Sequence, residues 1–422
     1  MTATNSGPQI DAARVIADLR ELDRRTGGAT GARRVAWGEQ WRVARAFLQE
    51  LLGEIGLRAE PDEAGNLWAV LGGERRPALA MGSHLDSVPS GGWLDGSLGV
   101  MAAVGALRAF AQSGERPSRD LALVDWADEE GARFGYSLLG SSAFAGSLDV
   151  EAVRELLDQG HERLVDVLAA NGVELDRASD AGRRRAEIDA YLELHIEQGP
   201  VLEADGLRAG AVAGCVGVER HRFTFTGRTG HAGTTPMDHR RDAGLAAATA
   251  ALAIERTAAG GGTATTGALE LVPGIVTAVA GRAELLVDLR HGDAQRLAAM
   301  LTEATEAARA AAAQRGCDLQ LSPVFAVAPV AFDQQLVALA RESCIEVTGA
   351  DRVLTSGALH DAAAVARRLP AAMVFAPSIG GVSHAADEDT ADGDLSAAIE
   401  TFAVCVQKAL RLPIDRGSDS AR

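Results

Sequence analysis

The chain has 422 residues, of which 47% are hydrophobic, and a formal net charge of −17. This length suffices for two domains with a large core, and the acidic excess argues against nucleic acid as a partner, because phosphates bind to a basic face. No apolar run approaches the length that spans a bilayer, no secretory signal is visible, and the four cysteines form no CxxC pair. We therefore expect a cytoplasmic protein with reduced thiols and no membrane partner.

Apolar spacing predicts helices that alternate with buried strands over much of the chain. Helices are expected over residues 10–22 and 41–55, and strands over residues 78–81, 121–124, 191–194 and 372–375. A further helix over 99–110 connects the first two strands. Strands interleaved with helices predict an α/β fold with a buried central sheet. The tail, residues 413–422, is expected to be disordered.

The middle of the chain has a different pattern. A strand with alternating polarity over 218–226 precedes a helix over 242–255, strands over 267–272 and 283–290, and an alanine-rich helix over 294–313. The glycine run at residues 260–262 marks a loop between the first helix and the second strand. This β-α-β-β-α order predicts a compact insert over roughly residues 215–328.

The ends of the four buried strands carry histidine and acidic residues. In chain order these residues are His84, Asp95, Glu129, Glu130, His195 and His384. Taken one at a time, an acidic surface turn or a hydrogen-bonded core histidine is the more ordinary explanation. In open α/β sheets, however, such loops share the carboxyl edge, where ligands bind. Their recurrence at four strand ends therefore favours a metal site.

Five of these side chains are predicted metal ligands: His84, Asp95, Glu130, His195 and His384. Three imidazoles and two carboxylates suit zinc, manganese, nickel or cobalt, whereas calcium requires oxygen ligands. Five ligands exceed the needs of one open zinc ion. A carboxylate shared between two divalent ions explains the number, and Asp95 is the natural bridge.

Two neighbouring acids have separate predicted roles. Glu129 adjoins the ligand Glu130 and is free to act as a general base toward water. Asp86 lies two residues after His84, so its carboxylate could accept the imidazole N–H that faces away from the metal. An ordinary acid in a turn is the equal alternative for Asp86.

These residues lie in motifs that resemble the dinuclear metallo-aminoacylase/carboxypeptidase superfamily, in its N-carbamoyl-amino-acid hydrolase and allantoate amidohydrolase branch. The similarity runs from about Asp62 to Glu388 and is carried by the stretches GSHLDSVP (82–89), DGSLG (95–99), EEGARF (129–134), HIEQGP (195–200), GHAGTTPM (230–237), DLRH (288–291) and SH (383–384) together with Glu388. The resemblance implies a metallopeptidase-like catalytic domain with a mixed sheet, formed by residues 1–214 and 329–422. It also implies that the 215–328 insert is an α+β lid through which the chain forms a homodimer.

The resemblance also implies the role of each site residue. One metal ion would take His84, Asp95 and His195, and the other Asp95, Glu130 and His384, with Glu129 as the general base. His231 in the lid would reach the partner subunit's active site and steady the oxyanion, while Arg290 would bind the carboxylate of a small-molecule substrate. The remaining substrate-binding positions are Gln198, Thr277 and His360.

Three positions depart from the pattern of this branch. Thr277 and Ala280 replace an asparagine and a proline of the lid, and Leu359 replaces a glycine before His360. Threonine has a shorter reach than asparagine and lacks its amide, so the metal chemistry should be unaffected while the substrate preference can differ.

The expected activity is hydrolysis of a non-peptide C–N bond, namely the ureido group of an N-carbamoyl-L-amino acid or an allantoate-like acid, with release of ammonia and CO2. Two alternatives remain open. One is an aminoacylase or peptidase that acts on N-acyl amino acids, and the other is a non-catalytic metal-binding homologue. The presence of Glu129 argues against the second.

Overall fold

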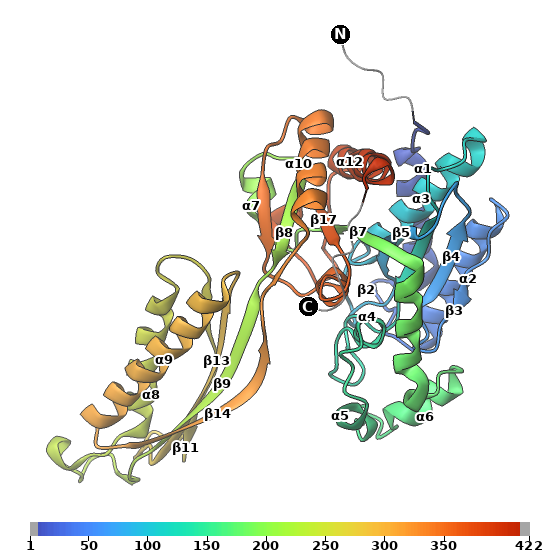
Figure 1. Cartoon of the computed structure of the whole chain (residues 1–422). Coiled ribbons are helices and arrows are strands. Elements are labelled where there is room, and N and C mark those ends of the chain that lie inside the picture. Colours follow the sequence, from blue (N-terminus) through green and yellow to red (C-terminus); the bar gives the residue numbers. More distant parts are fainter. Residues whose placement is uncertain (1–6, 414–422) are drawn as a thin grey trace. The chain divides into compact units, whose positions relative to one another are not determined.

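The computed structural model describes residues 7–413, which form two compact units (Figure 1). The first unit runs up to Ala213 and resumes at Phe332, and the second is Gly214–Ala331. The predicted insert, residues 215–328, lies inside the second unit. Residues 414–422 of the predicted disordered tail lie outside the described part of the chain.

The first unit is built on a mixed sheet with strand order β8-β17-β7-β5-β6-β4-β3 and with β16 beside β8. Neighbouring strands from β17 to β6 are parallel, whereas β8 is antiparallel to β17, and β4 is antiparallel to β6 and β3. The strands are β3 (Glu60–Pro61), β4 (Leu67–Leu71), β5 (Ala78–His84), β6 (Leu121–Trp126), β7 (Ile188–Ile196), β8 (Gly210–Cys215), β16 (Val353–Ser356) and β17 (Ala371–Ala376). The predicted α/β class with buried central strands is confirmed, because β5, β6 and β17 are buried throughout.

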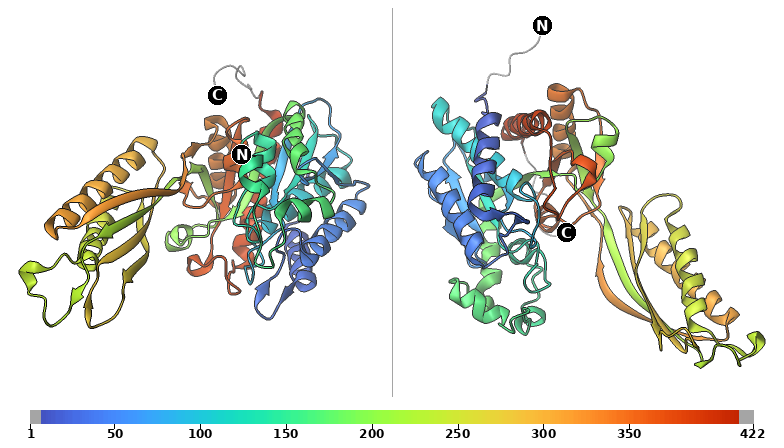
Figure 2. Two further views of the ribbon diagram at one scale, coloured as in Figure 1. Left: turned by 90° about the horizontal axis from the view of Figure 1, so that it is seen from below. Right: turned by 180° about the vertical axis from the view of Figure 1, so that it is seen from behind.

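Helices cover both faces of this sheet. On one face α3 and α12 contact the strands, with α1 against both and α10 beside α12 (Figure 2). On the other face α11 and η1 contact β7, and α4 packs against both of them. The helical elements are α1 (Ala12–Thr26), α2 (Glu39–Gly53), α3 (Ser97–Ser113), α4 (Leu139–Ala145), α5 (Val150–Arg154), α6 (Leu164–Ala170), η1 (Leu175–Glu187), α7 (Val201–Ala204), α10 (Gln334–Thr348), α11 (Asp361–Val365), η4 (Ile379–Gly381) and α12 (Asp392–Arg411). Within residues 7–413, no helix combines the length and apolar character that a bilayer-spanning helix needs.

The first helices follow from their apolar spacing. Val15, Leu19 and Leu22 of α1 are fully buried and join the main core, and Asp11 caps the helix by accepting a hydrogen bond from the Arg14 amide. A short hairpin of β1 (Gly27–Gly28) and β2 (Gly31–Ala32) separates α1 from α2.

The second unit is an antiparallel sheet with helices on one face. The strand order is β11-β13-β9-β14, and Phe223, Phe225 and Leu285 pack with apolar residues of the helices. Its elements are β9 (Gly217–Thr226), β10 (Gly230–His231), η2 (Met237–His239), α8 (Ala243–Glu255), η3 (Arg256–Ala258), β11 (Thr263–Val272), β12 (Ala278–Val279), β13 (Arg282–His291), α9 (Ala294–Gln314), β14 (Asp318–Val327) and β15 (Val330–Ala331).

The predicted β-α-β-β-α order was incomplete, because it missed the edge strand β14. Pro323 interrupts the strand pattern there, and the register with β9 shifts between Pro323 and Phe325. A proline within an apolar stretch argues against a central strand but is tolerated at an edge.

Candidate metal centre

The parallel strands bring the five predicted ligands to one edge of the sheet. His84 is the last residue of β5, His195 lies near the end of β7, and Asp95 directly precedes Gly96, the N-cap of α3. Glu130 follows β6, and His384 follows β17. Two groups result, in each of which the ligand atoms lie within 4.8 Å of one another: His84, Asp95 and His195, and Asp95, Glu130 and His384.

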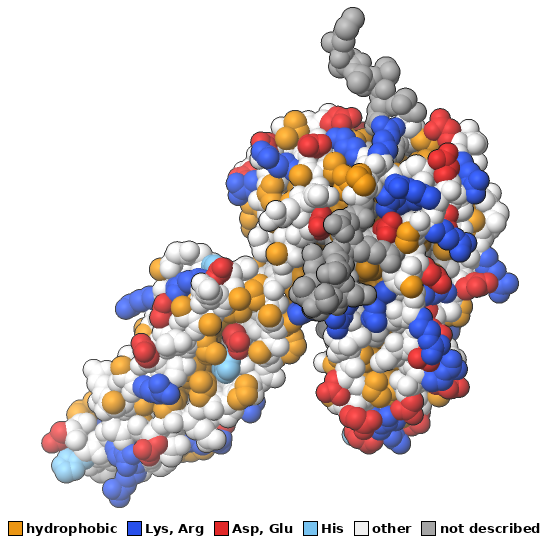
Figure 3. Space-filling view, in the orientation of Figure 1, with side chains coloured by type: hydrophobic (Ala, Val, Ile, Leu, Met, Phe, Trp, Pro, Cys, Tyr) orange, Lys and Arg blue, Asp and Glu red, His pale blue; other side chains and the backbone are white. Residues whose placement is uncertain are grey.

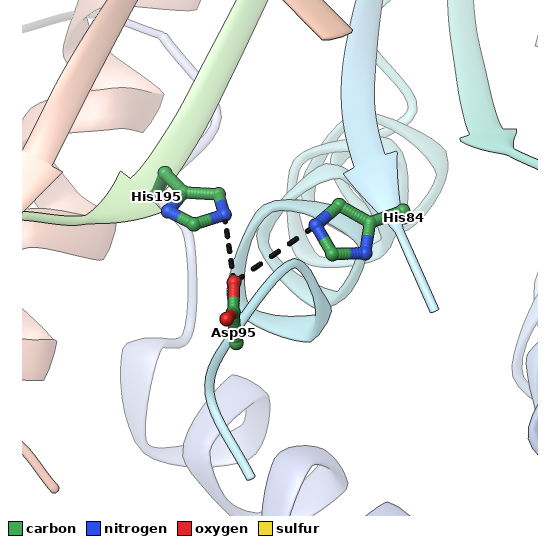
Figure 4. Close-up of side chains that lie close together, drawn as sticks. All are labelled: His84, Asp95 and His195. Carbon is green, nitrogen blue, oxygen red and sulfur yellow. Dashed lines mark ion pairs between the residues drawn. The ribbon is translucent and has the colours of Figure 1, made fainter. Parts of the chain in front are cut away.

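Asp95 belongs to both groups, and its two carboxylate oxygens face different histidines. Its Oδ1 lies 3.2 Å from His195 Nε2 and 3.9 Å from His84 Nε2. Figure 4 marks both contacts with dashed lines. Its Oδ2 lies 3.2 Å from His384 Nε2, and that nitrogen lies 3.5 Å from Glu130 Oε2. A carboxylate oriented in this way can serve two cation sites at once.

Backbone carbonyls orient the two buried imidazoles. His84 Nδ1 lies 3.0 Å from the Asp86 carbonyl oxygen, and His195 Nδ1 lies 2.9 Å from the carbonyl oxygen of Ile196. In the neutral ring each Nδ1 therefore donates its proton, and each Nε2 presents its lone pair to Asp95. This is the tautomer that a metal ligand requires.

Gly96 allows the close approach of the Asp95 loop to His84. Its φ of +64° lies in the left-handed region, and a Cβ added there would lie only 2.4 Å from the His84 ring. Any other residue at position 96 would displace the imidazole or the loop. Its amide also donates to His195 Nε2 at 3.3 Å.

Asp86 holds the acidic turn after β6. Its carboxylate accepts hydrogen bonds from the Glu129 and Glu130 amides at 3.2 and 3.1 Å. The expected bond from the His84 imidazole goes to the carbonyl of Asp86, whereas the carboxylate oxygen lies 3.6 Å from Nδ1. The two backbone amides lie closer to the Asp86 carboxylate than the His84 imidazole does, so this carboxylate holds the backbone at Glu129 and Glu130.

Acidic side chains crowd this edge of the sheet. Burial, followed by the charge of Glu130, raises the pKa of Glu129 well above its ordinary value, and Glu129 Oε2 lies 3.6 Å from His84 Nε2. Burial and the charge of Asp95 raise the pKa of Glu130 to about 8. Burial and the neighbouring acids disfavour the charged forms of these carboxylates, so a cation that binds between them would stabilise those forms. Together with the imidazole lone pairs, these carboxylates form a donor set that fits divalent cations.

Two predicted substrate-binding residues contact the ligands themselves. The Gln198 side-chain amide donates to Asp95 Oδ2 at 3.0 Å and to Ser383 Oγ at 3.1 Å. His360 is 2% exposed, its Nε2 lies 2.9 Å from Ser356 Oγ, and its ring packs edge-on against His195. His360 thus lies behind a ligand, and Gln198 lies on the bridging carboxylate.

The other three predicted residues belong to the second unit. His231 is exposed, and its Nδ1 accepts hydrogen bonds from the amides of Gly233 and Thr234 at 3.1 and 3.2 Å. The Thr277 carbonyl accepts from the Ala232 amide, which joins β12 to the histidine loop. The Nε of Arg290 donates to Asp288 Oδ1 at 2.8 Å.

Sequence reasoning missed a buried arginine beneath the site. Arg34 is fully buried and donates to the Leu85 carbonyl at 2.8 Å and to Ser97 Oγ at 2.9 Å. It thus ties the segment after His84 to the start of α3, where Asp95 lies. Its position in the run Arg33-Arg34 resembles an ordinary surface segment, so the sequence carries no signal for this role.

Comparison with known proteins identifies the family. The family model described as peptidase family M20/M25/M40 matches residues 80–408, which is more than half of the chain. The chain belongs to peptidase family M20/M25/M40. Members of this family are metal-dependent, and the two groups around Asp95 supply residues that could hold the metal.

Several curated relatives of this chain are named as amidohydrolases. The N-carbamoyl-L-amino-acid amidohydrolase of Paenarthrobacter aurescens is 33% identical over 407 residues, which cover 95% of this chain and 98% of that protein. The allantoate amidohydrolase of Escherichia coli (strain K12) is 34% identical over 381 residues, 89% of this chain and 92% of that protein. A crystal structure of a hydantoinase/carbamoylase-family amidase from Burkholderia multivorans has a TM-score of 0.89 at 30% identity and covers 96% of this chain and 100% of that chain. This member of the family is accordingly a hydrolase of linear amides.

Proposed function

We propose that the enzyme hydrolyses the ureido group of an N-carbamoyl-L-amino acid or an allantoate-like acid, with release of ammonia and CO2. The observation that carries this proposal is the pair of ligand groups that share Asp95, beside the buried carboxylate of Glu129. The names of the relatives support the substrate class, since two of them act on N-carbamoyl amino acids and allantoate.

Two divalent ions per subunit fit the donor set: zinc, manganese, nickel or cobalt. His84, Asp95 and His195 would hold one ion, and Asp95, Glu130 and His384 the other. Such a pair of ions supplies an acidified water molecule and polarises the scissile carbonyl.

The side chains of this chain perform the remaining chemistry. Glu129 would take a proton from the attacking water and deliver it to the leaving nitrogen. Both proton transfers need a carboxylate near the metal ligands, and Glu129 Oε2 lies 3.6 Å from His84 Nε2.

The second unit would supply two further groups. Because the Nδ1 of His231 accepts hydrogen bonds from two backbone amides, the proton of the neutral ring resides on Nε2, which can donate to the oxyanion. Asp288 aligns the guanidinium of Arg290 for the substrate carboxylate.

A homodimer that forms through the second unit is part of the proposal. Strand β11 is an edge strand of its sheet, and Leu269, Leu271 and Val272 on it are between 42% and 50% exposed. Figure 3 shows hydrophobic side chains of the second unit at the surface among charged ones. Exposed apolar edge strands tend to pair with another chain, and a second copy of this chain would satisfy both strands.

A cytoplasmic location is proposed as well, supported by the four buried free thiols.

Complementation between two inactive variants tests which subunit of the dimer supplies His231 to each active site. If each active site takes this histidine from its partner, Glu129→Gln and His231→Ala chains are inactive alone, but a mixed dimer has one intact site. Co-expression with two affinity tags should restore about a quarter of wild-type activity, because half of the randomly formed dimers carry one intact site of two. Purified mixed dimers without activity would show that His231 acts within its own subunit, whereas a His231→Ala chain that is active alone would show that His231 has no role in turnover.

A substrate panel tests the proposed function against the aminoacylase alternative. With added Mn²⁺ or Zn²⁺, the enzyme should release ammonia from N-carbamoyl-L-amino acids or allantoate and should leave N-acetyl-L-amino acids intact. Ammonia and free α-amine are measured separately, since only ureido hydrolysis yields ammonia. The D-enantiomers of the same N-carbamoyl compounds serve as the matched control. Turnover of the acetyl compounds alone would establish the aminoacylase instead.

A further inference from the structure

Glu388 is a buried carboxylate that joins two of the ligand-bearing loops. It is 1% exposed, and its Oε1 accepts hydrogen bonds from the amides of Leu94 and Asp95 at 3.2 and 3.0 Å. Its Oε2 accepts from Ser383 Oγ at 2.8 Å, and Ser383 directly precedes His384. One side chain therefore fixes the backbone of the bridging Asp95 and the position of the His384 loop.

The surroundings leave Glu388 little freedom. A Cβ added at Gly92 would lie 1.9 Å from Glu388 Oε1, so the absence of a side chain at position 92 makes room for the carboxylate. Ser383 also accepts the Gln198 amide at 3.1 Å, and the same amide donates to Asp95 Oδ2. Glu388, Ser383 and Gln198 form a closed set of contacts around the second oxygen of Asp95.

The two ligand groups differ in how firmly they are held. His84 and His195 are 2% and 0% exposed, and each has its Nδ1 fixed by a backbone carbonyl. The His384 side chain is 51% exposed, and its backbone has a φ of +57°. Among residues 7–413, no hydrogen bond to the Nδ1 of His384 is present. The position of His384 therefore depends on its loop, which the contact from Glu388 to Ser383 secures.

We infer that Glu388 is a positioning residue that selectively holds the half of the centre formed by Asp95, Glu130 and His384. The inference rests on the proposed pair of divalent ions. Loss of the carboxylate releases the Ser383–His384 segment, whereas His84 and His195 keep their strand positions and carbonyl contacts. The ion held by Asp95, Glu130 and His384 should therefore lose more affinity than the ion held by His84, Asp95 and His195, since the two groups share only the loosened Asp95.

Metal titration of the metal-free full chain tests this selectivity without reference to activity. Zn²⁺ or Co²⁺ binding is followed by competition with a chromophoric chelator, and the two steps are assigned with His84→Ala and His384→Ala. Glu388→Ala should lower the affinity of the step that His384→Ala removes by about 10- to 100-fold, the usual effect of a residue that orients a ligand. Glu388→Gln should restore that affinity to within a few-fold, since its amide can accept the Asp95 amide and donate to Ser383.

Asp120→Ala is the matched control. Asp120 is also a buried acid that accepts a backbone amide, from Gly73 at 2.7 Å, but it precedes β6 at the opposite end from the ligands. This control should lower the melting temperature and leave both metal steps unchanged. If Glu388→Ala does not fold, Ser383→Ala, which removes only the hydroxyl link, should weaken the same step. If Glu388→Ala weakens both binding steps equally, or weakens neither step, the inference is wrong and the proposed function stands. If the wild-type chain binds fewer than two ions, both the inference and the proposed function are wrong.

Discussion

Replacement of Glu129 by glutamine should lower kcat by about 10²- to 10⁴-fold, the usual contribution of a general base. Glutamine has the shape of glutamate but cannot take a proton from water. Glu129 is 7% exposed and lies beside His84 without belonging to either ligand group, so the substitution should leave the ligands in place. Ammonia release under saturating substrate measures the loss.

Glu130→Gln is the matched control for this prediction. Glu130 is the next residue in the same turn, and its amide is likewise held by the Asp86 carboxylate. It belongs to a ligand group, so its replacement should reduce metal content as well as kcat. Glu129→Gln should keep the wild-type metal content and melting temperature. A Glu129→Gln enzyme with kcat within a few-fold of wild type would exclude the general-base role.

Much of the fold follows from apolar patterns in the sequence. The four buried parallel strands were predictable because continuous apolar runs between helices require a sheet that is covered on both faces. The edge strand β14 was not predictable, since Pro323 and half-exposed residues remove the alternation of buried and exposed positions that identifies a strand. Edge strands receive little burial, so their sequences carry a weaker pattern than those of central strands.

The site was predictable to the extent that strand ends determine it. His84, His195 and the acids after β6 lie next to apolar runs, and the shared carboxyl edge of parallel strands brings them together. Contacts between loops carry no such periodic signal. The buried position of Arg34 and the hydrogen bonds of Glu388 to Asp95 depend on how loops from distant parts of the chain meet. The same limit applies to Asp86, whose carboxylate serves backbone amides that no spacing rule identifies.

The second large effect is expected for Asp95→Ala, which should abolish tight binding of both metal ions. Each oxygen of Asp95 faces a different ligand group, at 3.2 Å from His195 on one side and from His384 on the other. Removal of the carboxylate leaves two ligands in each group, fewer than the three that a catalytic zinc site supplies. The fall in affinity should exceed the about 10- to 100-fold expected of a residue that only orients a ligand, and ammonia release should be undetectable.

Variants that lose a ligand from only one group test whether Asp95 is shared between two metal sites or whether the two sites are independent. His84→Ala removes a ligand from the first group only, so the group of Asp95, Glu130 and His384 should still bind one ion. By the same reasoning, His384→Ala should still bind the ion held by His84, Asp95 and His195. Metal content after dialysis, measured by elemental analysis, should therefore be about one ion in each histidine variant and none in Asp95→Ala, since only Asp95 contributes to both sites. One ion retained by Asp95→Ala would mean that one group binds without this carboxylate, and the bridging role would have to be abandoned.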